Sequence, residues 1–129
     1  MEKILSILRG LGIPFAYDHF AQGESPDPPF ICYLIPASDN FSADGKVYYK
    51  IDQFNIELYT DLKDLSLERK VEKALDDASI FYNKSETWIE SESLYEVLYT
   101  FEMGGENNAK EYNGSLVKTT LEEIIVNTF

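Results

Sequence analysis

Apolar residues recur along the chain with two different periods, and the change from one to the other predicts the order of helices and strands. Residues 2–11 carry apolar side chains at helical spacing, and Pro14 follows as a stop signal. Residues 15–20 predict a short strand, whereas residues 21–29 hold three of the five prolines and predict a loop. The continuous apolar run 30–36 then predicts a strand that ends at its proline.

The longest alternating stretch changes face in its middle. It follows a polar turn at residues 38–45 and runs from residue 46 to about residue 60. A slip of one residue near Asp52 and Gln53 is what a β-bulge produces, because two residues there oppose one on the partner strand. The pattern therefore predicts a long, bent hairpin arm. Its apolar positions are odd in the first half and even in the second, namely Val47, Tyr49 and Ile51, then Phe54, Ile56 and Leu58.

The second half of the chain repeats the order of helix and then strands. Residues 65–80 predict a helix whose charged residues, among them Glu68 and Glu72, face solvent. Segments 81–91 and 94–103 predict a closing pair of strands, and residues 104–115 are typical of a flexible linker. The tail, residues 116–129, fits a helix or a strand. The whole order predicts an α+β fold, with helices packed on one face of a mainly antiparallel, curved sheet. The expected buried stripe of the helix is Leu67, Val71, Ala74, Leu75 and Ala78.

Length and charge narrow the classes of partner. The 129 residues suffice for one domain with its own core. The net charge of −12 disfavours nucleic acid, which needs clustered Lys and Arg, and it equally disfavours an anionic membrane surface. Cys32 is the only cysteine, so a disulfide within the chain is impossible and a reducing compartment fits. No stretch approaches a signal peptide or a membrane span, so we expect a cytosolic protein.

Residues that could carry chemistry are few. The single histidine, His19, stands on a short segment where a structural or exposed role is expected, and Cys32 is expected to be a buried, inert thiol. One Cys and one His cannot build the usual zinc site within one chain. The polar loop 39–45 lacks the spacing of a calcium loop, so a plain turn is expected. We expect no enzyme, no cofactor and no metal. The dense carboxylates Glu86, Glu90, Glu92 and Glu96 are expected to form a solvated acidic surface.

Residues 1–103 resemble the small tail-completion, or tail-terminator, proteins of long-tailed bacteriophages, which are sometimes described as minor capsid proteins. Five segments, in the expected order, carry the resemblance. The tail, residues 116–129, has no counterpart in that pattern. The segments are EKILSILRGLGIPFAY, PPFICYLIP, NFSADGKVYYKIDQFNIELYTD, LSLERKVEKALDD and TWIESESLYEVLYTFEM.

The resemblance implies an α+β fold with a curved sheet and a non-catalytic ring, commonly a hexamer. Such a ring ends the tail tube and joins the tail to the head. The implied partners are further copies of the chain, the tail-tube protein and the head connector, in the bacterial host cytoplasm during assembly and then in the virion. The bent arm would reach the next subunit of the ring. Acidic side chains lining the ring would repel DNA and let it slide.

Two sets of residues follow from this hypothesis. The hairpin offers subunit contacts through aromatic anchors and one carboxylate, namely Phe41, Asp44, Tyr48 and Tyr49. The expected lumen-facing acidic residues are Glu90, Glu92, Glu96 and Glu102. Three alternatives stay open: a connector-stopper or minor capsid component, a small intracellular protein-binding module, and an enzyme with a pocket at His19.

Overall fold

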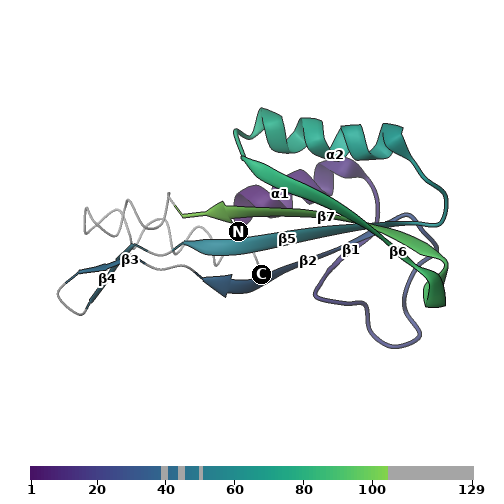
Figure 1. Ribbon diagram of the computed structural model, residues 1–129, viewed down its shortest axis with the longest axis horizontal. Helices are drawn as coiled ribbons and strands as arrows, with labels where there is room; N and C mark the ends of the chain where they lie inside the picture. The colour runs from purple at the N-terminus through teal and green to yellow at the C-terminus, as the bar shows by residue number, and fades with distance from the viewer. Residues whose placement is uncertain (39–40, 44–45, 50, 105–129) are drawn as a thin grey trace.

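Two helices and a five-stranded sheet account for most of the residues that the structure describes (Figure 1). The computed structural model describes the backbone of residues 1–38, 41–43, 46–49 and 51–104, and the side chains of residues 1–38 and 51–104. The predicted linker and tail therefore lie outside the described residues, apart from Gly104. The elements are α1 (Glu2–Leu11), β1 (Phe15–Tyr17), β2 (Phe30–Ser38), β3 (Phe41–Ala43), β4 (Lys46–Tyr49), β5 (Asp52–Thr60), α2 (Leu65–Asp77), β6 (Tyr82–Ile89), a 3-10 turn (Glu90–Glu92) and β7 (Leu94–Met103).

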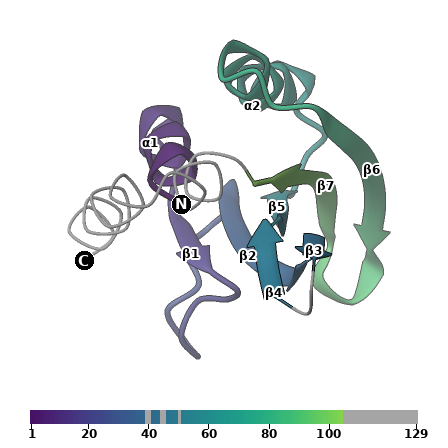
Figure 2. The ribbon, with the colours of Figure 1, turned by 90° about the vertical axis from the view of Figure 1, so that its left-hand side faces the viewer.

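The sheet has the order β1-β2-β5-β7-β6, and only the β1–β2 pair is parallel. Strands β3 and β4 pair with each other in a separate two-stranded sheet. Figure 2 shows both helices on the same side of the five-stranded sheet. The predicted fold class, α+β with helices on one face of a mainly antiparallel sheet, is confirmed.

Local sequence explains where the helices begin and end. The Asp64 carboxylate accepts a hydrogen bond from the Leu67 amide at 3.0 Å and so caps the first turn of α2. Helix α1 ends at Leu11, and Gly12 takes the left-handed conformation (φ 75°) that glycine adopts without steric cost. The Lys70 side chain of α2 donates to the Leu11 carbonyl at 2.9 Å. It thus gives a hydrogen-bond partner to a carbonyl at the C-terminal end of α1, which has none within its own helix.

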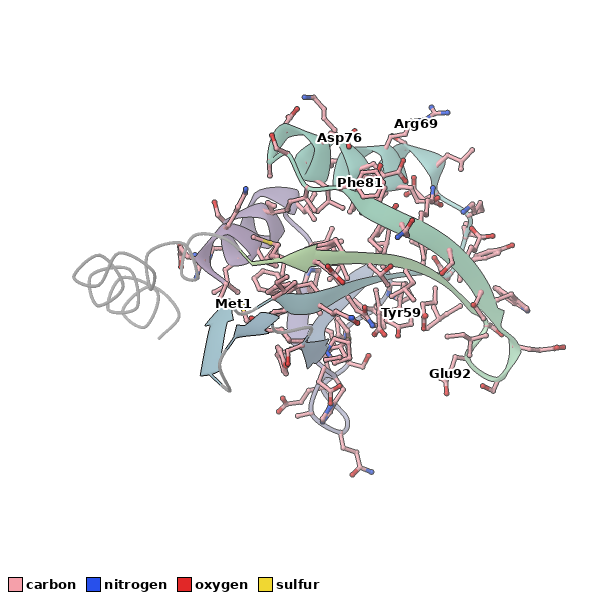
Figure 3. All side chains as sticks on the ribbon, turned by 60° about the vertical axis from the view of Figure 1, so that its left-hand side comes forward. Met1, Tyr59, Arg69, Asp76, Phe81 and Glu92 are labelled. Carbon is pink, nitrogen blue, oxygen red and sulfur yellow. The ribbon has the colours of Figure 1, made fainter. Side chains whose placement is uncertain are left out.

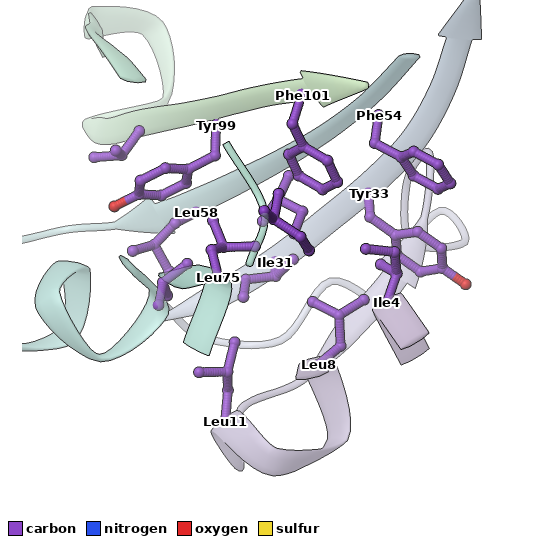
Figure 4. Close-up of a cluster of buried hydrophobic side chains, with 14 of the residues drawn as sticks. Ile4, Leu8, Leu11, Ile31, Tyr33, Phe54, Leu58, Leu75, Tyr99 and Phe101 are labelled. Carbon is purple, nitrogen blue, oxygen red and sulfur yellow. The ribbon is translucent and has the colours of Figure 1, made fainter. Parts of the chain in front are cut away.

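The core fills the space between the helices and the sheet (Figure 4). Strands β5 and β7 alternate strictly, and their buried residues all face the helices. Phe54 and Phe101 are directly opposite each other and stack with ring centroids 5.6 Å apart. The expected stripe of α2 is confirmed, with two members fully buried and three packed at the margin. The cluster includes Ile4, Leu8, Leu11, Ile31, Tyr33, Ile56, Leu58, Val71, Leu75, Val97 and Tyr99.

The single long strand expected from residue 46 to about residue 60 is two strands. β4 ends at Tyr49 and β5 begins at Asp52. The shift of the apolar residues from odd to even positions therefore falls between two strands that belong to different sheets. A bulge at Asp52 and Gln53 is not present, because β5 pairs with β7 without interruption from Asp52 to Thr60. The expected turn at residues 38–45 was also wrong in part, since it contains β3.

The bulge lies instead in the facing strand, and it explains why Pro36 does not end β2. Ile35 and Pro36 together oppose the single residue Phe54. The Ile35 amide donates to the Tyr17 hydroxyl at 3.2 Å. Pro36 has no backbone N–H, so it leaves no donor without a partner in the bulge. The strand can therefore continue to Ser38 through a residue that would interrupt a regular ladder.

Among the described helices, neither is long and apolar enough to cross a membrane.

Two leucines separated by four residues test the position of the core. Leu58 is fully buried in β5, whereas the side chain of Leu62, in the loop before α2, is 76% exposed. Leu58→Ala should lower the free energy of unfolding by about 2–5 kcal/mol, because it leaves a cavity under α2. Leu62→Ala is the matched control and should change it by less than about 0.5 kcal/mol. Urea unfolding of both variants measures the difference, and equal losses would contradict this core.

Candidate functional site

The face of the five-stranded sheet that points away from the helices is the first candidate for an interaction surface, and we call it the open face. It consists of the odd-numbered residues of β5 and β6, the even-numbered residues of β7, Ala16 of β1, and Phe30, Cys32 and Leu34 of β2. Figure 3 shows Tyr59 on this side of the sheet, whereas Arg69 and Asp76 lie on α2 on the opposite side.

The open face carries three carboxylates and no cation within its strands. Glu57, Glu96 and Glu102 belong to it, and Lys84, the only Lys or Arg in the five strands, is on the helix face. The open face therefore has no cation of its own strands beside its carboxylates, whereas the helix face carries Lys84 together with Glu86. Of the predicted acidic residues, the structure brings Glu96 and Glu102 to this face. Glu57 completes the set and was missed by sequence reasoning.

The other predicted site residues lie elsewhere. Glu90 and Glu92 are exposed in the 3-10 turn between β6 and β7, beyond the end of the strands, where Figure 3 labels Glu92. Asp44 lies outside the described residues. The side chains of the three expected aromatic anchors of the hairpin also lie outside the described side chains, although their backbone forms β3 and β4. These anchors are Phe41, Tyr48 and Tyr49.

Tyr59 links two carboxylates of the open face near the end of β5. Its hydroxyl oxygen lies 3.0 Å from Glu57 Oε1 and 3.0 Å from Glu96 Oε2. A hydroxyl has one proton to donate, so the second contact is a hydrogen bond only if that carboxyl holds a proton itself. Burial raises the pKa of Glu57 against the lowering effect of the Tyr59 hydrogen bond, and the nearby Glu96 charge raises it further.

An aromatic contact covers one end of this face. The Phe30 ring stacks on Tyr59 with centroids 5.1 Å apart, and Phe20 from the loop after β1 meets Phe30 edge-on at 5.5 Å. Cys32 lies beside Glu57 on the neighbouring strand and is buried. Burial, with the adjacent Glu57 charge, raises the pKa of the Cys32 thiol to about 11. The thiol stays protonated at neutral pH, which fits the inert role expected from the sequence.

A second polar cluster lies on the helix face and corrects the prediction for Glu68. Its side chain was expected to face solvent but is 2% exposed. Lys63 lies 2.5 Å from Glu68 Oε2, and Lys84 of β6 lies 2.8 Å from Glu68 Oε1. Lys84 also pairs with Glu72 at 2.8 Å, and Lys63 pairs with Glu86. This cluster of two lysines and three glutamates joins α2 to the edge strand β6.

The cluster stabilises the ionised form of the buried Glu68 side chain, so it does not shift this group toward a reactive protonation state. Burial opposes ionisation of Glu68, but hydrogen bonds and charges from Lys63 and Lys84 outweigh it and lower the Glu68 pKa. The Tyr99 hydroxyl donates to Glu72 at 2.7 Å, and burial together with Glu72 raises the Tyr99 pKa far above its ordinary value. Glu68 therefore stays ionised and Tyr99 stays protonated at neutral pH, as in a structural ion-pair network.

Catalytic arrangements are absent from the described residues. His19 is exposed, and its Nδ1 lies 2.8 Å from the carboxylate of its sequence neighbour Asp18, with no further member of a triad. No group of three His, Cys, Asp or Glu side chains in residues 1–38 and 51–104 could hold a metal ion.

Comparison of the sequence with models of known protein families gives no match, and a search of the curated proteins gives none either.

Glu68→Gln tests the buried ion-pair cluster. Removing the charge leaves Lys63 and Lys84 with weaker partners, so we expect a loss of about 1–3 kcal/mol in the free energy of unfolding at neutral pH. Because the folded state lowers the Glu68 pKa, its contribution is present above the ordinary pKa of 4.5 and is lost as pH falls through the lower folded value.

The difference between Glu68→Gln and the wild-type chain should therefore shrink on acidification, as measured by chemical unfolding at several pH values. Asp77→Asn is the control, because it removes an exposed i,i+4 pair with Lys73 and should leave stability unchanged. A loss for Glu68→Gln no larger than that of the control would contradict the network.

Glu57→Gln tests the carboxylates of the open face, with the opposite pH dependence. The folded state raises the pKa of Glu57 above its ordinary value of 4.5 and so favours the protonated carboxyl. This preference stabilises the fold below the ordinary pKa of 4.5, and the stabilisation is lost as pH rises through the folded pKa of Glu57. Glutamine is neutral at all pH values, so Glu57→Gln should be more stable than wild type at neutral pH, and this advantage should fade in acid. The control Glu102→Gln, at an exposed position of the same face, should follow the wild-type curve. A loss of stability in Glu57→Gln at neutral pH would contradict the raised pKa of Glu57.

Proposed function

We propose that the chain is a non-catalytic structural protein of a long-tailed phage or prophage, which forms a ring that ends the tail tube and joins the tail to the head. The observation that carries the proposal is that the five strands hold carboxylates and no Lys or Arg on the open face. Glu57, Glu96 and Glu102 lie on the open face without a cation from the strands, whereas Lys84, the one Lys or Arg of the five strands, lies on the helix face.

A channel for DNA needs a wall of this kind. A surface that binds DNA requires clustered Lys and Arg, while a wall of uncompensated carboxylates repels phosphate and lets DNA pass. In the proposed ring the open faces line the lumen through Glu57, Glu96 and Glu102. Glu90 and Glu92, at the turn between β6 and β7, would extend the acidic surface toward one rim. The ring is proposed to form in the host cytoplasm and to stay at the head–tail junction of the virion.

The β3–β4 ladder supports the subunit contact of this ring. It is a separate pair of strands beyond the five-stranded sheet, and in Figure 1 it projects past the end of both helices. A projecting ladder can add backbone pairing or apolar contact to a neighbour, and a ring of identical subunits closes through one such heterologous contact. We propose the hairpin residues Phe41, Asp44, Tyr48 and Tyr49 for this contact, with the tail-tube protein and the head connector as the further partners.

Deletion of the gene from its phage or prophage tests the proposal by electron microscopy of the particles. Loss of a ring that stops tube growth should give overlong tails and heads without tails. Complementation with the wild-type gene should restore virions, and Asp44→Lys should restore them poorly if the hairpin makes the subunit contact. Asp27→Lys, at an exposed position in the loop before β2, is the matched control for charge and should complement fully.

The alternatives give different particles. Normal-length tails beside filled heads that lose their DNA would favour a connector-stopper or minor capsid component. Normal, infective virions after deletion would overturn the assembly function and favour the intracellular protein-binding module.

A further inference from the structure

The edge strand β6 has a regular backbone that is open to a further strand. Among the described strands its only partner is β7, and the two pair residue for residue from Tyr82 opposite Phe101 to Ile89 opposite Leu94. No proline or bulge interrupts these eight residues, and most of the side chains are exposed. The alternate amide and carbonyl groups of such an edge point outward, which is the usual template for strand addition.

Exposed aromatic rings lie at both ends of the same strand. Phe81, directly before β6, is 87% exposed, and Trp88, near its end, is 47% exposed. Trp88 rests on Tyr95 with centroids 4.7 Å apart, so its position is fixed by the sheet although half of its surface meets solvent. Rigid, half-exposed aromatic side chains beside an open edge are typical anchors of protein interfaces.

The sequence of β6 is complementary to itself. Antiparallel pairing of two copies about a two-fold axis perpendicular to the sheet is longest when the axis passes through the middle of the strand, at Ser85 or Glu86. An axis at Glu86 would set Glu86 opposite Glu86 of the second copy, and an axis at Lys84 would set two lysines opposite each other. Directly opposed like charges destabilise a strand pair.

An axis at Ser85 removes every such conflict. Lys84 then lies opposite Glu86 of the second copy, and Tyr82 lies opposite Trp88 of the second copy, all on the helix face. On the open face, Ser85 lies opposite its own counterpart and Asn83 lies opposite Thr87 of the second copy. Opposite charges and aromatic pairs across strands are each stabilising. The two ion-pair clusters would also join, because Glu86 already pairs with Lys63 and Lys84 with Glu68.

We propose that two copies of this chain associate through β6 in an antiparallel, two-fold register centred on Ser85, which extends the sheet across both subunits. The occupant of the edge is thus a second copy of the chain. This contact is separate from the hairpin contact of the proposed ring and does not depend on that function.

Single cysteine substitutions along the open-face side of β6 test the register in the full chain under mild oxidation. Opposed residues have Cβ atoms about 4.5–5.5 Å apart, close to the separation that a disulfide needs. Ser85→Cys should therefore form a covalent dimer. Asn83→Cys alone should not, because its counterpart is displaced by four residues, roughly 13 Å along the strand. Thr87→Cys alone should behave in the same way.

A mixture of Asn83→Cys and Thr87→Cys should cross-link between the two variants, as non-reducing gels and mass spectrometry measure. All three positions are exposed, so the variants should fold as the wild type does, and unchanged unfolding curves verify it. The wild-type chain is the background control, because its Cys32 is buried. A Ser85→Cys chain that cross-links no faster than Asn83→Cys would overturn the proposal. Equal cross-linking of all three single variants would indicate collision without a register and would overturn it as well.

Discussion

Strands β5 and β7 form the centre of the sheet, and each presents apolar side chains to one side only. Because residues of a strand alternate between its two faces, this pattern obliges both helices to pack on the same side. It also leaves the opposite side with Glu57, Glu96 and Glu102, at positions where neither α1 nor α2 supplies a lysine. The acidity of the open face is thus a consequence of where the core lies, and not of a separate acidic motif.

The ion-pair cluster shows how the fold attaches its edge strand. Strand β6 contributes little apolar surface to the core, and among the described strands its backbone pairs with β7 alone. Lys84 reaches from β6 across to Glu68 and Glu72 of α2, and so connects the edge to the helix layer. Burying Glu68 costs desolvation energy, which the two lysines offset. An apolar contact at this place would leave the position of β6 along α2 less specific.

The sequence predicted the elements that follow a simple period. Helix α1, helix α2 and the strands β6 and β7 were expected within a few residues of their bounds, because apolar spacing and capping signals such as Asp64 are local. Pro36 and Glu68 were misjudged, because the features that accommodate them lie elsewhere in the chain. The Tyr17 hydroxyl accepts the hydrogen bond of the Ile35 amide in the bulge next to Pro36, and Lys63 and Lys84 compensate the charge of Glu68. For the same reason Glu57 was missed: its partners Tyr59 and Glu96 meet only when β5 pairs with β7.

Strand β7 is the last described strand in the chain, yet it lies between β5 and β6 in the sheet. During synthesis β5 therefore emerges with its central edge unpaired, and α2 emerges before the surface on which it packs is complete. Only when β7 has left the ribosome can the nine-residue ladder with β5 form and bring the two halves of the core together. The core thus cannot close until β7 is available, and until then the edge of β5 that β7 will cover stays unpaired.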